Sequence, residues 1–277
     1  RSQRVLRKLQ QQYEITPFFC GDYFEYTPFQ SCGLREIDKF FIFGYPRVFP
    51  KRNKENYYIY YPLFATLSPL DFKIKKFEKI FTLSNQTLNY FLKHGLNAEY
   101  LSIENIDNFY LTKKKSKNTE CVFYTICSMS KRDALSSLIK AFYHTFYPHE
   151  KASLMLHITE KENPSSIIES IISGLGFNYK WKKEINLIYD STTEKSIAET
   201  HSKGDIFVSI DRVSDWCIYE YDAIKMGCKV IPINQFSHLD VPFGYSYDCH
   251  QSHLWREPEC HNLSRIMREK YEEFFQG

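Results

Sequence analysis

Acidic and aromatic side chains gather in one stretch near the C-terminus, between Gly204 and Pro232. These residues are Asp211, Asp215, Trp216, Glu220 and Asp222. A carboxylate can accept two hydrogen bonds from neighbouring hydroxyl groups. This group of residues therefore indicates a binding site for a polar ligand.

The elements expected around these residues form a strand, a polar loop, a helix and a second strand. Asp205 to Ile210 is a short apolar run rich in β-branched residues, which is typical of a buried parallel strand. Tyr219 to Met226 predicts a helix that Gly227 can end in a left-handed conformation, and Lys229 to Ile233 predicts the next strand. In open parallel sheets, ligands bind at the carboxyl ends of the strands beside helix N-termini, where the acidic residues are expected.

A basic pair occupies a similar position earlier in the chain. Cys121 to Cys127 predicts a strand, Ser128 follows it, and Ala134 to Phe146 predicts a helix with one apolar face. Lys131 and Arg132 lie just before that helix. Cations and helix N-terminal amides both stabilise phosphate charge, so the pair is a candidate phosphate site. The alternative is a solvated basic pair on a surface loop.

The rest of the chain also alternates between strands and helices, which predicts α/β architecture with parallel sheets. Further strands are expected at residues 15–20, 38–44, 57–63, 77–83, 98–103, 153–158 and 185–189, and further helices at 5–14, 86–94, 165–175, 193–202 and 263–275. The charged run 113–118 predicts a linker between two domains, residues 1–112 and 113–277, although it could instead be a surface loop within one domain.

The unit at 204–232 resembles the donor-sugar segment of GT-B glycosyltransferases of the retaining, nucleotide-sugar-using type. Counting back five residues from Gly227 places Asp222 and Ala223 on the Glu-Ala pair of that family. Trp216 then falls on the family's aromatic residue, and Ser214 with Asp215 falls on its Glu-Gly pair. The chain thus departs from the family at both acidic positions, and Glu220 fits the second one only with a shift of two residues.

Two further segments carry the same resemblance. The stretch 122–142 is similar to the strand, loop and helix that open the family's C-terminal domain, with Arg132 on the family's Arg and Asp133 in place of its Lys. The stretch 77–103 is similar to the last strand, helix and strand of the N-terminal domain. The resemblance covers about residues 77–232, and it implies two Rossmann-like domains facing across a cleft. The family's first strand and glycine-rich loop are not found, so we expect an N-terminal domain that is reduced or truncated.

The resemblance also implies roles for individual residues and an activity. The family transfers a sugar from a nucleoside diphosphate sugar to an acceptor, with retention and without a tightly bound metal or other cofactor. The residues that would bind the donor are Ser128, Lys131, Arg132, Ser214, Asp215, Trp216, Glu220 and Asp222. Asp222 would hold the ribose, and the basic pair would hold the diphosphate. The acceptor stays open: a glycan, a protein, a small molecule or a modified DNA base.

Composition sets broader limits. The chain has 277 residues, of which 43% are hydrophobic and 25% charged, so it can bury a substantial core. A net charge of +3 is weak evidence for a polyanionic partner. The eight cysteines contain no CxxC pair, which favours reduced thiols in a cytoplasmic protein over a zinc site. No segment approaches the roughly 20 apolar residues of a membrane span.

Three other functions remain open at this stage. The missing first Glu and the missing glycine-rich loop favour a non-catalytic binding module that keeps a glycosyltransferase-like fold. A nucleotide-sugar epimerase with a doubly wound fold would leave its product sugar attached to the nucleotide. A DNA-modifying glycosyltransferase would bind DNA in a strongly salt-dependent manner.

Overall fold

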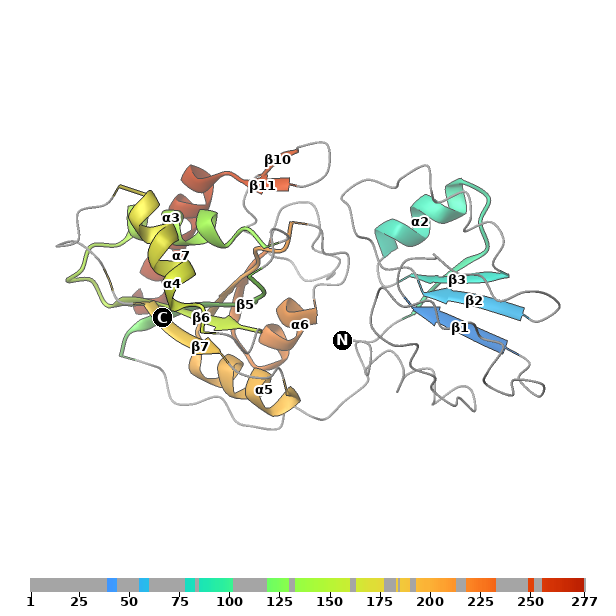
Figure 1. The fold of residues 1–277 in the computed structure, drawn as a ribbon, viewed down its shortest axis with the longest axis horizontal. Coiled ribbons are helices and arrows are strands. Elements are labelled where there is room, and N and C mark those ends of the chain that lie inside the picture. Colours follow the sequence, from blue (N-terminus) through green and yellow to red (C-terminus); the bar gives the residue numbers. More distant parts are fainter. Residues whose placement is uncertain are drawn as a thin grey trace. The chain divides into compact units, whose positions relative to one another are not determined.

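A computed structural model of the chain describes two compact units, one holding the first four strands and the other holding all later elements. The described residues are 39–43, 55–59, 78–82, 85–101, 119–129, 133–159, 163–176, 183, 185–189, 193–212, 218–232, 249–251 and 256–276. The predicted helix at 5–14, the strand at 15–20, the linker at 113–118 and the domain boundary at residue 112 lie outside them. The α/β class predicted from the alternating pattern is confirmed (Figure 1).

The first unit contains a four-stranded parallel sheet in simple sequence order. Its strands are β1 (Lys39–Phe43), β2 (Glu55–Ile59), β3 (Lys79–Thr82) and β4 (Ala98–Tyr100). The helix α2 (Asn85–Lys93) connects β3 to β4, and Gly95 ends it with a φ of 71°. All four strands fall where the sequence predicts them. The strand β2 begins two residues before the expected range, and residues 60–63 of that range lie outside the described residues.

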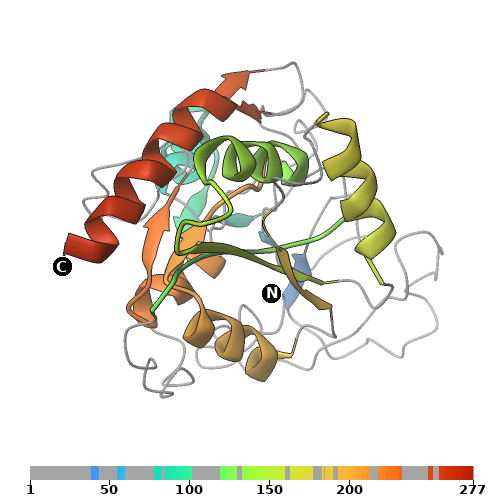
Figure 2. The same ribbon diagram turned by 90° about the vertical axis from the view of Figure 1, so that its left-hand side faces the viewer.

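The second unit contains a five-stranded parallel sheet in the order β7-β6-β5-β8-β9. Its strands are β5 (Cys121–Cys127), β6 (Ala152–Ile158), β7 (Ile185–Tyr189), β8 (Ile206–Val208) and β9 (Lys229–Ile231). Its helices are α3 (Leu135–Thr145), α4 (Ser165–Gly174), α5 (Glu194–Lys203), α6 (Ile218–Lys225) and α7 (Cys260–Gln276). Figures 1 and 2 show α3, α4 and α7 on one face and α5 and α6 on the other.

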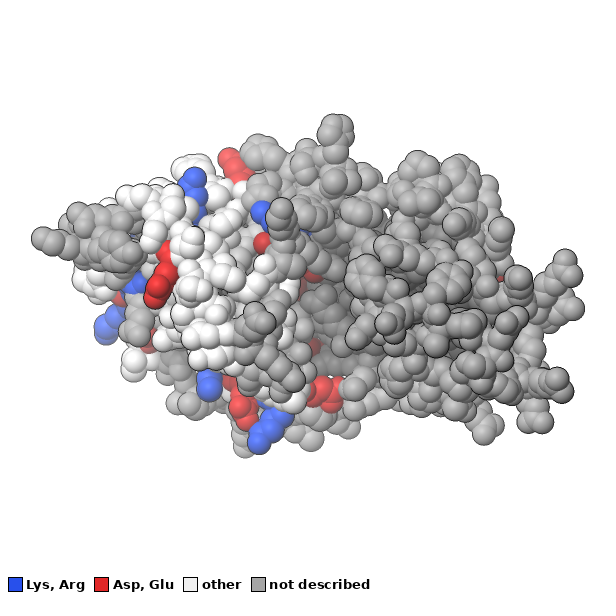
Figure 3. Space-filling view, in the orientation of Figure 1, with Lys and Arg blue, Asp and Glu red and all other residues white. Residues whose placement is uncertain are grey.

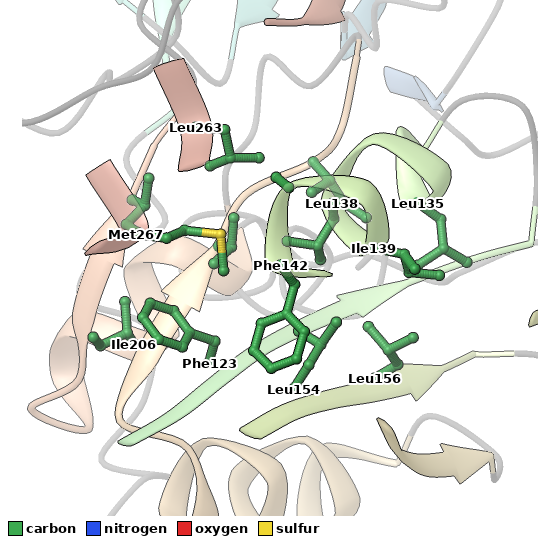
Figure 4. Close-up of a cluster of buried hydrophobic side chains, with 14 of the residues drawn as sticks. Phe123, Leu135, Leu138, Ile139, Phe142, Leu154, Leu156, Ile206, Leu263 and Met267 are labelled. Atoms are coloured by element: carbon green, nitrogen blue, oxygen red, sulfur yellow. The ribbon is translucent and has the colours of Figure 1, made fainter. Parts of the chain in front are cut away.

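The larger apolar core lies between this sheet and the helices α3, α4 and α7. Alternate residues of β5, among them Phe123, point to this face because side chains along a strand alternate in direction. Phe123 and Phe142 are fully buried in this core (Figure 4). The Phe123 ring lies 5.2 Å from the ring of Phe146. Burial of each such side chain contributes about 1.5–3 kcal/mol. Leu263 and Met267 bring α7 into the same core.

The opposite face of the sheet carries a smaller core with polar contacts inside it. The hydroxyl of Tyr124 on β5 lies 2.7 Å from Nδ1 of His201 on α5, and Nδ1 of His157 on β6 lies 2.7 Å from the hydroxyl of Thr200. All four side chains are buried. Two neighbouring residues of α5 therefore bond to two neighbouring strands, which fixes the helix on the sheet.

The C-terminal segment differs most from the sequence prediction. A short antiparallel hairpin of β10 (Cys249–Gln251) and β11 (Arg256–Pro258) precedes the last helix, and the sequence did not predict it. The helix α7 begins at Cys260, three residues before the predicted start. Arg268 anchors it: the guanidinium donates to both carboxylate oxygens of Glu150 and to the carbonyl oxygen of Thr145.

Candidate functional site

The strand order of the second sheet defines where a ligand would bind. The chain runs outward from β5 to β6 and β7, then returns to the other side of β5 for β8 and β9. The connections that leave β5 and β8 therefore run in opposite directions. The place between β5 and β8 where the direction changes is the topological switch point of the sheet, and ligands of open parallel sheets bind at such a switch point. The bridge between Asp133 and Asp211, with Ala134 N donating to Ile210 O at 2.9 Å, brings these two connections together.

Asp133 organises the connection after β5. One of its carboxylate oxygens, Oδ2, accepts a hydrogen bond from the Ser128 amide at 2.7 Å and another from the Ser128 hydroxyl at 2.6 Å. Such short bonds are typical of an ionised acceptor. Arg212, on the connection after β8, donates from Nη1 to the Asp133 carbonyl oxygen at 3.2 Å. Ser128, Asp133 and Arg212 thus form one hydrogen-bonded group across the switch point.

This group only partly matches the residues that the sequence singled out. Ser128 is at the switch point, as expected from its place after β5. Lys131 and Arg132 lie outside the described residues, although their neighbour Asp133 belongs to the group. The sequence reading did not assign Arg212 a role. Its position shortly after a buried strand, at the carboxyl end of β8, is the signal that could have found it.

The predicted acidic residues of α6 are described, and both are buried. Glu220 is 3% exposed and Asp222 is 1% exposed. The helix begins at Ile218, and Gly227 follows it with a φ of 74°, which confirms the predicted left-handed cap. The other predicted residues of this segment, Ser214, Asp215 and Trp216, lie outside the described residues.

The charge of Asp222 also acts on the smaller core. Burial raises the pKa of Tyr124 well above its ordinary value, and the neighbouring Cys228, Asp205 and Asp222 raise it further. Because its hydroxyl stays protonated at neutral pH, Tyr124 can donate a proton to Nδ1 of His201. Asp222 therefore lies within electrostatic reach of the central strand β5.

No group of three or more His, Cys, Asp and Glu side chains among the described residues is arranged to hold a metal ion. The described cysteines Cys121, Cys127, Cys228 and Cys260 are reduced and not joined in disulfide bonds. None of the helices in the described ranges combines the length and apolar character that crossing a membrane requires.

Comparison of the whole structure with solved proteins identifies the fold. The pneumococcal O-GlcNAc transferase GtfA, solved with UDP and GlcNAc, matches 80% of this chain with a TM-score of 0.56 and 12% identity. Sucrose-phosphate synthase from Thermosynechococcus elongatus matches 81% with a TM-score of 0.59 and 11% identity. Anabaena HepE, solved with UDP-glucose, matches 79% with a TM-score of 0.55 and 12% identity. The chain has the GT-B glycosyltransferase fold, as the resemblance predicted.

Comparison of the amino-acid sequence with known families and sequences finds no match. No protein-family model matches the chain, and neither does any curated protein sequence. The matched region covers 46% of GtfA, 60% of the sucrose-phosphate synthase and 63% of HepE. The chain therefore spans roughly half to two thirds of the length of these structural relatives.

Proposed function

We propose that the protein transfers a sugar from a nucleoside diphosphate sugar to an acceptor. The observation that carries this proposal is the hydrogen-bonded switch point between β5 and β8 within a GT-B fold. A diphosphate bound there would lie beside the segment that contains Lys131 and Arg132. Cations placed at a leaving diphosphate stabilise the charge that develops in the transition state.

The remaining roles follow from the resemblance to the GT-B family. Asp222 would accept hydrogen bonds from the ribose, and Ser214, Asp215 and Trp216 would line the sugar site. We propose retention of configuration and chemistry without a bound metal ion. UDP is the first nucleotide to test, because GtfA was solved with UDP and HepE with UDP-glucose. We also propose a reducing compartment such as the cytoplasm, which the four reduced cysteines among the described residues support.

A non-catalytic nucleotide-binding module is the second candidate, because the chain departs from the GT-B family at both acidic positions, the first Glu included. The burial of Glu220 and Asp222, at 3% and 1% exposure, limits the access of a ribose in both candidates and does not separate them. A protein that has lost its chemistry would still bind nucleoside diphosphates. Only the catalytic protein would release free sugar from a nucleotide sugar in the absence of an acceptor.

A DNA acceptor has less support from the charges. On the face shown in Figure 3, the described Lys and Arg side chains are interspersed with Asp and Glu side chains. A protein that neutralises several phosphates usually presents a basic stripe instead. DNA binding that weakens steeply with added salt would nevertheless support that acceptor.

The experiment is a thermal-shift titration with UDP, GDP and uridine, followed by a hydrolysis assay with the sugar nucleotide of the preferred base. A ligand that binds only the native state raises the melting temperature. Arg132→Ala should weaken diphosphate binding by about 10-fold or more and uridine binding far less. Lys140→Ala removes an exposed cation from α3 and serves as the control. Failure of every nucleotide to shift the melting temperature would overturn the proposal.

A further inference from the structure

We propose that Asp133 and Arg212 are positioning residues for the donor diphosphate. The inference rests on the proposed function and adds two residues to it. Asp133 would hold Ser128 in place, and Arg212 would fix Asp133 against the connection that follows β8. The two residues would thereby fix the point from which Lys131 and Arg132 contact the diphosphate.

The first step of the argument is the contact between Asp133 and Ser128. A single carboxylate oxygen accepts from both the amide and the hydroxyl of a residue five positions earlier. These bonds link the point where the chain leaves β5 to the point just before α3 begins. Lys131 and Arg132 lie in sequence between these two fixed points. The entropy of ordering Ser128 and Asp133 is thus lost during folding rather than during binding.

The second step is the tie to the neighbouring connection. Arg212 donates to the carbonyl oxygen of Asp133, while Asp133 and Asp211 form a backbone bridge. Asp133 is therefore held by its side chain toward β5 and by its backbone toward β8. A residue fixed from both sides keeps its place when a ligand of high charge binds nearby, which is the requirement for preorganised electrostatic binding.

The third step concerns the charge of Asp133. An acidic side chain beside a diphosphate would repel it, and the resemblance places Asp133 where the GT-B family has a Lys. In this structure the carboxylate is bound by two donors of Ser128. Hydrogen bonds of this kind stabilise the charged form and reduce its effect on the surroundings. Removing the charge while keeping the oxygen should leave diphosphate binding nearly unchanged if Asp133 positions Ser128, and should tighten it if Asp133 repels the diphosphate.

Two variants of Asp133 distinguish these roles by calorimetric titration with UDP, or with GDP if that is the preferred base. Asp133→Asn keeps an oxygen that can accept from Ser128 and should bind within about twofold of the unmodified protein. Asp133→Ala should lose about 10-fold for the diphosphate and leave uridine binding unchanged. Tighter diphosphate binding by both variants would show repulsion and overturn the proposal. Glu169→Ala removes an exposed carboxylate of α4 and is the control.

A double-mutant cycle tests whether Asp133 and Arg212 act through the basic pair. If they do, adding Asp133→Ala or Arg212→Ala to Arg132→Ala should weaken diphosphate binding little further. Fully additive losses would mean that these residues do not act through Arg132, and would overturn the proposal. Equal losses for diphosphate and uridine would likewise contradict it.

A separate measurement tests the positioning role without any ligand. The Ser128 amide donates to Asp133, so its hydrogen exchange should be slow in the unmodified protein and in Asp133→Asn. It should become faster in Asp133→Ala, while the amide of Phe123 in the core strand keeps its rate. An unchanged Ser128 rate would overturn the inference alone. Absence of nucleotide binding by the unmodified protein would instead overturn the proposed function.

Discussion

At the scale of single residues, burial determines what the acidic side chains of α6 can do. Asp222 is 1% exposed, and its charge contributes to the raised pKa of Tyr124. It therefore interacts with the core of the domain besides its proposed role toward ribose. A carboxylate that binds both ribose hydroxyls discriminates strongly against a ligand that lacks one of them. A carboxylate that contacts only core residues does not discriminate between these ligands.

The first prediction therefore compares UDP with 2′-deoxy-UDP. The unmodified protein should prefer UDP by about 10-fold or more, because the deoxy analogue leaves a buried carboxylate oxygen without its partner. Asp222→Asn should reduce this preference to about twofold. The measurement is calorimetric titration of both ligands, with Glu220→Gln as the comparison. A preference that Asp222→Asn leaves intact would assign the ribose to another residue.

The residues at the switch point could be predicted from the sequence only where their neighbours in the sequence mark them. Ser128 could be singled out because it follows an apolar run, which is a local signal. The bond between Arg212 and Asp133 joins residues 79 positions apart, and no periodicity in the sequence encodes that pairing. The burial of Glu220 and Asp222 is likewise a property of tertiary packing. A segment of acidic residues in a sequence is typical of a solvated surface.

At the scale of the elements, one close approach explains why a glycine separates α5 from β8. A Cβ atom on Gly204 would lie 2.1 Å from Cδ1 of the Tyr124 ring. That ring is fully buried and its hydroxyl is bonded to His201, so it has no room to move. Glycine is required at this position because the Tyr124 ring leaves no space for a Cβ atom, and not because residue 204 has an unusual φ.

The second prediction follows from this contact. Gly204→Ala should lower the free energy of unfolding by about 1–3 kcal/mol or more, since overpacking forces side chains and backbone apart. Gly174→Ala is a matched control, because no atom lies within 4 Å of its added Cβ and the residue is helical. That control should be neutral or stabilise the protein by up to about 1 kcal/mol. Urea denaturation of both variants measures the difference.

The third prediction concerns the ion pair that holds α7. The bond from Arg268 is the main cause that keeps the pKa of Glu150 below its ordinary value of 4.5. A carboxyl whose pKa is lower in the folded state adds stability above its unfolded value and loses it as the pH falls through the folded value. Arg268→Ala should therefore cost about 2 kcal/mol at neutral pH, and this cost should shrink as the pH drops below 4.5.

Arg265→Ala is the control for this prediction. Arg265 pairs with Glu269 on the surface of the same helix, with side chains 52% and 35% exposed. Such a pair contributes at most about 0.5 kcal/mol. The cation of Arg268 also lies 4.9 Å from the ring centre of Phe146, so part of its contribution should persist in acid. A cost for Arg268→Ala that does not depend on pH would assign its whole effect to packing.

Helices and strands could be predicted where a short stretch of neighbouring residues is enough to recognise them. The strands β5 and β7 match their predicted ranges. The apolar run of β5 is almost wholly buried, as is typical of a central parallel strand, whereas β7 lies at the edge of the sheet and each of its residues is partly or fully exposed. The hairpin of β10 and β11 was missed, since each strand has three residues and no apolar alternation. The first turn of α7 was missed because Cys260, His261 and Asn262 do not resemble a helix start.

At the scale of the whole molecule, the proposed donor residues all belong to the second unit. The alternating pattern predicted parallel sheets, and both units have them. The predicted boundary at residue 112 is still untested. The order β7-β6-β5-β8-β9 could not be obtained from the sequence, because it depends on which side of β5 each later strand joins. That order is nevertheless what creates a ligand site at β5 and β8.

The last prediction uses this division of the chain. Saturation with UDP, or with GDP if that base is preferred, should slow hydrogen exchange in the amides that follow β5 and β8, and in α6. The amides of β1 to β4 should keep their rates, because the proposed diphosphate and ribose contacts all come from the second unit. Mass spectrometry of peptides from both units measures this in one experiment, with uridine as the ligand that lacks phosphate. Uridine should protect α6 but not the connection after β5. Equal protection of both units by the diphosphate would mean that the nucleotide does not bind mainly to the second sheet, and the roles assigned at its switch point would then have to be abandoned.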